Sequence, residues 1–372
     1  MTEISVAYDR EIFLLQNYGG VSKSFSKNIE VMLERKELGI EPLLTFSRSN
    51  NQHIIESAIN ESYFLKPARK FLQPRNSLET LITYGPIRTW SSFFAGGNNP
   101  IERADIGHAT YYRPQKYDFK KVKKLAVTIH DFIPEYLNWN GIRNPHIGKS
   151  QLIKKADLVV CISETTRDLM YERYGLIHDN VVVVPHGADI VSRNYEKGEV
   201  FPILYVGHRK GYKNFDLLVS ALTILRKVRP FKLWIAGPPL DDLEISNLNS
   251  KLGSNWSSFE NPSDKEIKNL YSKAAVHCVT SRMEGFGMTA IESVGAGCPV
   301  IASDIPIFRE TLRGNGILFN PDNPEELENS LFQLMTDQAH YDSIENNLVN
   351  VREQYSWNSV TPILTEAYRK LI

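Results

Sequence analysis

The stretch that decides the fold is Ser281-Arg282-Met283-Glu284-Gly285-Phe286-Gly287-Met288-Thr289-Ala290-Ile291-Glu292. It lies between two short, apolar, β-prone segments, 275–280 and 299–303, which we interpret as strands. Residues 288–294 should therefore form the crossover helix of a βαβ unit. The two glycines allow a tight turn and a close approach of a ligand, and the helix that follows offers unpaired N–H groups and the positive end of its dipole. The stretch predicts a binding site for an anion, most simply a diphosphate.

Two glutamates, Glu284 and Glu292, flank this turn. The first lies in the turn and the second inside the helix, so they do not share a helix face and are expected to bind separate parts of one ligand. Carboxylates accept hydrogen bonds from hydroxyl-rich groups. Because each glutamate taken alone is typical of a solvated surface residue, it is their spacing around Gly-Phe-Gly that indicates a sugar nucleotide.

A different ligand also fits part of the pattern. Gly285-x-Gly287-x-x-Ala290 satisfies the dinucleotide fingerprint, and Asp304 follows the next strand, where it could accept a ribose hydroxyl. That fingerprint belongs on the first strand and helix of a dinucleotide domain. Here the strands expected at 203–206 and 232–236 come earlier, which disfavours an NAD-dependent oxidoreductase.

Composition narrows the class of protein. The chain has 372 residues, long enough for two domains, and its 43 Lys and Arg balance 43 Asp and Glu, so no nucleic-acid partner is indicated. The three cysteines, Cys161, Cys278 and Cys298, lie in or beside apolar segments, as buried reduced thiols do. No signal segment and no apolar run near ~20 residues is found, so we expect a cytoplasmic protein that does not cross a membrane.

The rest of the chain repeats the strand, turn, helix pattern. A strand at 4–8 is followed by Tyr18-Gly19-Gly20 and an amphipathic helix from Val21 to about Lys36, and Ser192 to Val200 reads as a linker between two series of strands. Such alternation predicts two doubly wound α/β domains whose ligands bind beyond the carboxyl ends of the strands, in one cleft. The other strands are expected at 43–46, 106–109, 125–129, 158–162 and 181–184.

Cations follow one of the expected strands, 203–206, and a histidine follows another, 125–129. Gly207-His208-Arg209-Lys210-Gly211-Tyr212-Lys213-Asn214 carries Arg209 and Lys213, which are suited to neutralise a diphosphate, although a basic loop by itself is typical of a solvated surface. His130-Asp131 ends the strand at 125–129, so the imidazole is expected at the cleft edge, either bound to a hydroxyl or capping a loop.

Together with Pro185-His186-Gly187 and a final Tyr355-Ser356-Trp357 helix, these motifs resemble the retaining GT-B glycosyltransferases of the large Glu-x7-Glu family that includes bacterial mannosyltransferases, glycosyltransferase family 4. The resemblance implies that Glu284 contacts the donor sugar, that Glu292 binds the ribose, and that Arg209 and Lys213 neutralise the leaving diphosphate. It implies that His130 contacts the donor sugar or the acceptor hydroxyl, and that backbone amides around Phe286, Gly287 and Met288 contact sugar and phosphate. The other donor-binding residues that it implies are Gly20, Thr289 and Asn261.

The resemblance also implies a domain plan: 1–192 binds the acceptor, 200–354 binds the donor, and 355–372 is a helix that packs back on the first domain. The expected reaction is hexose transfer from GDP-mannose, or next a UDP-sugar, to a glycan or lipid-linked glycan of cell-surface polysaccharide or lipopolysaccharide. No Asp-x-Asp occurs in the sequence, so no metal and no cofactor are expected. The alternatives are an epimerase or phosphorylase on the same fold and a non-catalytic sugar-nucleotide binder.

Two basic stretches, Leu65 to Arg75 and Lys116 to Lys124, lie in the expected acceptor domain. Each alone is typical of a solvated charged face. Combined with the lipid-linked acceptors frequent in the family, they give the hypothesis of peripheral contact with an anionic membrane at its inner face.

Overall fold

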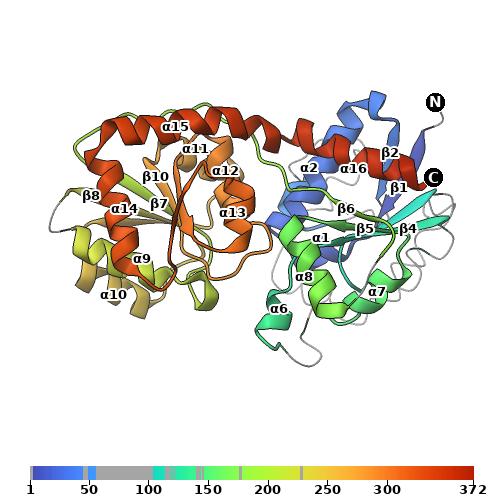
Figure 1. Ribbon diagram of the computed structural model, residues 1–372, viewed down its shortest axis with the longest axis horizontal. Helices are drawn as coiled ribbons and strands as arrows, with labels where there is room; N and C mark the ends of the chain where they lie inside the picture. Colours follow the sequence, from blue (N-terminus) through green and yellow to red (C-terminus); the bar gives the residue numbers. More distant parts are fainter. Residues whose placement is uncertain are drawn as a thin grey trace. The chain divides into compact units, whose positions relative to one another are not determined.

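The computed structural model describes residues 3–44, 49–55, 104–113, 119, 122–139, 144, 146–175, 178–226 and 229–372. The chain divides into two compact units, each with helices around a six-stranded parallel sheet (Figure 1). Unit 1 comprises Met1–Ile162, Thr166–Val184 and Thr361–Ile372, and unit 2 comprises Ser163–Thr165 and Pro185–Val360. The expectation of two doubly wound domains is confirmed.

The sheet of unit 1 has the strand order β2-β1-β3-β4-β5-β6. Its strands are buried on both faces, because one apolar layer joins them to α2 and α16 while a second joins them to α7 and α8. The strands are β1 Ile4–Tyr8, β2 Ile40–Leu44, β3 Ile106–Ala109, β4 Lys124–Ile129, β5 Leu158–Cys161 and β6 Val181–Val183. The helices that lie wholly or mostly in unit 1 are α1 Glu11–Leu15, α2 Gly20–Glu34, α3 Gln52–Ile55, α6 Ile133–Tyr136, α7 Lys149–Lys155, α8 Glu164–Tyr174 and α16 Trp357–Leu371.

The sheet of unit 2 has the order β12-β11-β10-β7-β8-β9, so β7 and β10 are neighbours although two strands separate them in the chain. The strand order reverses at this pair, which is where open α/β sheets bind ligands. The strands are β7 Phe201–Val206, β8 Phe231–Gly237, β9 Trp256–Glu260, β10 Val276–Val279, β11 Val300–Ser303 and β12 Ile317–Phe319. The α-helices are α9 Phe215–Leu225, α10 Asp242–Leu252, α11 Asp264–Lys273, α12 Met288–Gly295, α13 Pro306–Leu312, α14 Pro324–Thr336 and α15 Gln338–Arg352.

Two strands of unit 2, β9 and β12, were not predicted from the sequence. Both are edge strands: β9 has no fully buried residue and contains two serines, and β12 has three residues. Edge strands are often short and polar, which removes the apolar run that identifies a strand in a sequence. The strands that were predicted are present, and their ends agree to within a few residues.

The segment predicted as a linker, Ser192 to Val200, has neither helix nor strand, yet it is anchored to unit 2. The guanidinium of Arg193 donates hydrogen bonds to the backbone carbonyls of Tyr271 and Ser272, at 3.1 and 3.0 Å, and forms an ion pair with Glu345 at 2.9 Å.

The three cysteines are free and buried, as predicted.

Candidate functional site

The loop after β7 is held close to the end of β8. Gly207 has φ +122°, and a Cβ on Gly237 would lie 2.5 Å from the carbonyl oxygen of Gly207. Only glycine at 237 permits these two backbones to approach so closely. The loop then continues through a 3-10 turn, Gly211–Lys213, into α9.

The loop after β10 is tied to the loop after β7. The hydroxyl of Thr280 donates to the carbonyl of Lys213 at 2.9 Å, and the backbone N–H of Arg282 donates to the carbonyl of Tyr212 at 2.8 Å. The turn ends at Gly287, whose φ of +80° is in the left-handed region and whose missing Cβ would lie 2.4 Å from Cε1 of Phe308. Helix α12 begins at the next residue, so its first N–H groups face this turn.

These two loops bring Lys213 and Glu284 together. The ammonium of Lys213 lies 2.6 Å from Oε1 of Glu284, and the two side chains are 23% and 14% exposed. A cation suited to a phosphate and a carboxylate suited to sugar hydroxyls thus meet beside the first turn of α12. The sequence predicted both as site residues, and the structure puts them in contact.

Arg209, the other predicted phosphate ligand, is engaged elsewhere. Its buried guanidinium pairs with Glu244 at 2.7 and 3.1 Å and donates to the backbone carbonyls of Pro238 and Pro239, at 2.9 Å each. The hydrogen bond from Arg209 holds the pKa of the Glu244 carboxyl below its ordinary value, although burial opposes this effect. Arg209 therefore braces the segment between β8 and α10, and of the two predicted cations it is Lys213 that contacts Glu284.

The remaining predicted donor residues of unit 2 lie around α12 and β9. Glu292 lies on α12 and accepts a hydrogen bond from the Tyr271 hydroxyl at 3.3 Å. Met288 and Thr289 form the half-buried first turn of that helix, beside Gly287.

Phe286 and Asn261 are held by contacts within unit 2. The Phe286 ring is buried, with its centroid 5.2 Å from that of His186. Asn261 follows β9 with φ +44° and donates from its backbone N–H to the carbonyl of Gly237 at 2.8 Å. Sequence patterns alone did not locate Asn261, because the strand before it was not recognised.

Gly20 and His130 belong to unit 1. Gly20 is the first residue of α2, and Phe25 on that helix has its ring centroid 5.8 Å from the imidazole of His130. His130 is buried, its backbone N–H donates to the Tyr112 hydroxyl at 2.9 Å, and its Nε2 donates to the carbonyl of Thr110 at 3.2 Å. The imidazole is thus fixed at the carboxyl end of β4.

The basic stretch Leu65 to Arg75 lies outside the described residues, as does most of Lys116 to Lys124. Two lysines of the second stretch are described, and both form ion pairs: Lys123 with Asp105 at 2.6 Å and Lys124 with Asp157 at 3.1 Å. Among the helices that the structure describes, none is both long and apolar enough to cross a bilayer. Within the same part of the chain, His, Cys, Asp and Glu side chains form no cluster suited to a metal ion.

Two family models match the chain. The model described as Glycosyltransferase Family 4 matches residues 66–191, and the model described as Glycosyl transferases group 1 matches residues 190–350. An uncharacterized glycosyltransferase of Haemophilus influenzae is 25% identical over 231 residues, 60% of this chain and 65% of that protein. The O-antigen chain mannosyltransferase RfbU of Salmonella typhimurium is 25% identical over 218 residues, 56% of this chain and 60% of that protein. The matched segments thus span less than two thirds of either relative.

Solved structures resemble the chain over nearly its whole length. Sucrose-phosphate synthase from Thermosynechococcus elongatus has a TM-score of 0.71 at 18% identity, covering 99% of both chains. Anabaena Alr3699/HepE, in complex with UDP and glucose, has a TM-score of 0.70 at 15% identity, covering 99% of this chain and 100% of that chain. At such identities the likeness concerns the fold, and it confirms the predicted GT-B class.

Proposed function

The chain belongs to glycosyltransferase family 4, whose members are retaining, metal-independent hexosyltransferases, and we propose that it moves a hexose from a nucleoside-diphosphate sugar to a glycan hydroxyl. GDP-mannose is the first donor we propose, because relatives of this chain are named O-antigen mannosyltransferases. UDP-sugars come second. The acceptor we propose is a glycan or lipid-linked glycan of cell-surface polysaccharide or lipopolysaccharide.

The observation that carries this proposal is the contact between Lys213 and Glu284 at the point where the strand order reverses, beside the first turn of α12. In the proposed reaction the bond between the anomeric carbon and the diphosphate oxygen breaks while the acceptor oxygen bonds to the same face of the sugar. The hydroxyl proton passes to the departing phosphate. Lys213 and the N–H groups of α12 stabilise the charge that develops there, each donor contributing ~3 kcal/mol by analogy with oxyanion donors.

Nucleotide binding tests the proposal. We expect GDP or UDP, in the presence of a chelator, to raise the thermal unfolding temperature, because a ligand at 100 times its Kd adds ~2.7 kcal/mol to the folded state. Lys213→Met should abolish most of that stabilisation. NAD⁺ is the comparison ligand: stabilisation by NAD⁺ alone would mean that Gly285-x-Gly287-x-x-Ala290 binds a dinucleotide and that the transferase proposal is wrong.

For the place of action we propose the cytoplasmic face of a membrane that carries the acceptor, with the basic stretches 65–75 and 116–124 in contact with anionic lipid. Flotation with anionic vesicles tests this. Replacement of Lys120 and Lys121 by Gln should reduce flotation, and unchanged flotation would count against membrane contact through this stretch.

A further inference from the structure

A buried lysine in unit 1 contacts the backbone of Asp131, the residue after His130. Lys149 is the first residue of α7, and its side chain is fully buried. Its ammonium lies 3.5 Å from the centroid of the Phe132 ring and 5.1 Å from that of Tyr112. Lysine is rarely buried without a partner because a charge loses its hydration inside a protein, so this side chain needs an explanation.

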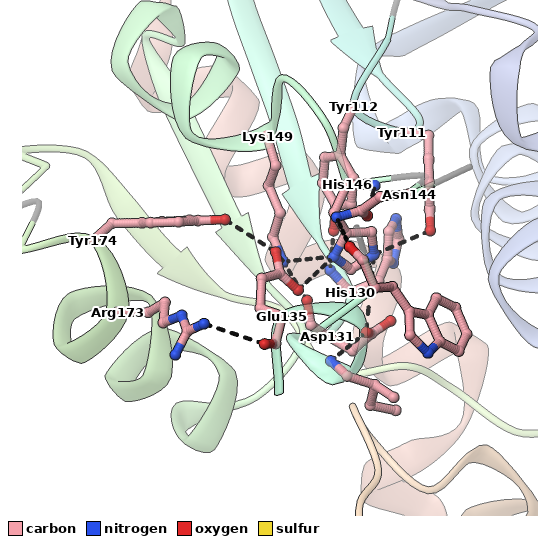
Figure 2. A network of polar contacts seen from close by, with 12 residues as sticks. Tyr111, Tyr112, His130, Asp131, Glu135, Asn144, His146, Lys149, Arg173 and Tyr174 are labelled. Atoms are coloured by element: carbon pink, nitrogen blue, oxygen red, sulfur yellow. Dashed lines mark hydrogen bonds and ion pairs between the residues drawn. The ribbon is translucent and has the colours of Figure 1, made fainter. Parts of the chain in front are cut away.

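The partners of Lys149 converge on its ammonium (Figure 2). The ammonium donates to Oε1 of Glu135 at 3.0 Å and to the backbone carbonyl of Asp131, and Nδ1 of His146 lies 3.2 Å away. Nδ1 of His146 also lies 2.8 Å from Oε2 of Glu135, and the Tyr174 hydroxyl donates to Oε1 at 3.0 Å. Both oxygens of the Glu135 carboxylate are therefore engaged.

The charges of this cluster are mutually stabilised. Burial raises the pKa of Glu135, but the hydrogen bond from His146 and the charge of Lys149 more than offset this and lower it to about 2. Burial lowers the pKa of Lys149 to about 8, against the opposing charges of Glu135 and Asp131. At neutral pH the lysine and the glutamate form an ion pair.

The cluster fixes the segment that leaves β4. Lys149 binds the carbonyl of Asp131, next to His130, and also binds Glu135 on α6, so it joins both ends of this short segment. Oδ1 of Asp131 accepts a hydrogen bond from the N–H of Ile133 at 2.9 Å.

A second chain of contacts reaches the imidazole of His130 from the side. Nε2 of His146 lies 3.2 Å from the hydroxyl of Tyr111, and the Tyr111 ring stacks on His130 with centroids 6.0 Å apart and an interplanar angle of 15°. The cluster therefore touches His130 both through the backbone of Asp131 and through the ring of Tyr111.

We propose that Lys149 is a positioning residue for transfer: it holds the backbone between β4 and α6 so that His130 and Asp131 keep the orientation that the reaction needs. The inference rests on the proposed function. Stability alone does not account for the ion pair, because well-packed apolar side chains can commonly replace a buried ion pair without loss of folding stability. An apolar side chain at 149 would lack the contact with the carbonyl of Asp131, the residue that follows His130.

The test compares two variants with a matched control. Lys149→Met keeps most of the length of the side chain and removes the charge, but it leaves Glu135 buried without its cation and so risks unfolding. Lys149→Met combined with Glu135→Gln removes both charges and is expected to fold. Lys154→Met, an exposed position on the same helix, is the control.

Three quantities are measured for each variant: the affinity for GDP and UDP by calorimetry, the rate of hydrolysis of GDP-mannose and UDP-glucose, and the NMR signals of the His130 imidazole, assigned by their loss in His130→Gln. For the double variant we expect nucleotide affinity within twofold of wild type, hydrolysis at least tenfold slower and shifted His130 signals. Lys154→Met should match wild type in all three.

A double variant with wild-type hydrolysis and unshifted His130 signals overturns the inference and leaves Lys149 a structural residue. Failure of the proposed function gives a different result, because wild type then binds neither nucleotide and releases no sugar. That outcome removes the inference as well, since Lys149 would have no transfer reaction to serve.

Discussion

At the scale of single residues, Lys213 and Glu284 form an ion pair at 2.6 Å. A diphosphate competes with Glu284 for the lysine, and sugar hydroxyls compete with the lysine for the carboxylate. Binding a complete sugar nucleotide therefore exchanges one internal ion pair for two contacts with the ligand. A nucleoside diphosphate without its sugar breaks the same pair but leaves Glu284 with nothing in exchange.

Glu284→Gln should consequently bind GDP or UDP more tightly than wild type, by about fivefold, if the partly buried pair contributes about 1 kcal/mol. Hexose transfer by the same variant should fall at least tenfold, because the sugar loses its carboxylate. Calorimetry and a transfer assay measure the two effects.

Glu199→Gln, at an exposed position before β7, is the control and should change neither quantity. Weaker nucleotide binding by Glu284→Gln would contradict the exchange of partners and would indicate that Glu284 orders the turn itself.

At the scale of elements, the turn into α12 depends on Gly287. Its φ of +80° disfavours any residue with a Cβ, and the added methyl group would lie 2.4 Å from Cε1 of Phe308. Gly314 has nearly the same φ, +79°, with open space around the missing Cβ. Alanine at 314 would therefore introduce backbone strain only, whereas alanine at 287 would introduce the same strain and a steric clash.

We expect Gly314→Ala to lower the free energy of unfolding by about 1 kcal/mol through strain alone, with unchanged nucleotide affinity. Gly287→Ala should be destabilised further and should bind GDP or UDP at least tenfold more weakly, because the first turn of α12 is displaced. Urea unfolding and calorimetry measure both. Equal affinities in the two variants would count against a role of the α12 terminus in binding.

At the scale of the whole molecule, buried histidines in both units make stability depend on pH. Burial lowers the pKa of His108 in unit 1 to about 3, and in unit 2 it lowers the pKa of His186 to about 4 and that of His277 to about 3. Above pH ~6.5 neither the folded nor the unfolded imidazoles bind protons. Below pH ~6.5 these histidines bind protons in the unfolded chain but not in the folded chain. The free energy of unfolding therefore decreases as the pH falls towards the pKa values that the histidines have in the folded protein.

Between pH 6.5 and 5 each of these histidines should therefore cost up to ~1.4 kcal/mol of stability per pH unit. His277 tests this, because among the described residues neither of its ring nitrogens has a hydrogen-bond partner. His277→Leu should be more stable than wild type at pH 7, by about 1 kcal/mol, and should lose less stability on acidification. Urea unfolding at a series of pH values measures this, and parallel curves for the two proteins would refute it.

The sequence by itself determined the alternation of strands and helices and the glycine turn before α12, and it predicted Glu284 as a site residue. Each is a local property: an apolar run, a glycine at a turn, or a spacing within one βαβ unit. The edge strands β9 and β12 were missed because they are short or polar, so that their place in the sheet, and not their composition, makes them strands.

Only the tertiary structure decided which side chains meet. The sequence predicted both Lys213 and Arg209 as phosphate ligands. Because β7 and β10 are neighbours in the sheet, Lys213 contacts Glu284, 71 residues away, whereas Arg209 binds Glu244 and two backbone carbonyls. The cluster around Lys149 had no sequence signal for the same reason. The partner of a charged side chain is set by strand order and packing, which bring distant segments together, and spacing along the chain does not encode it.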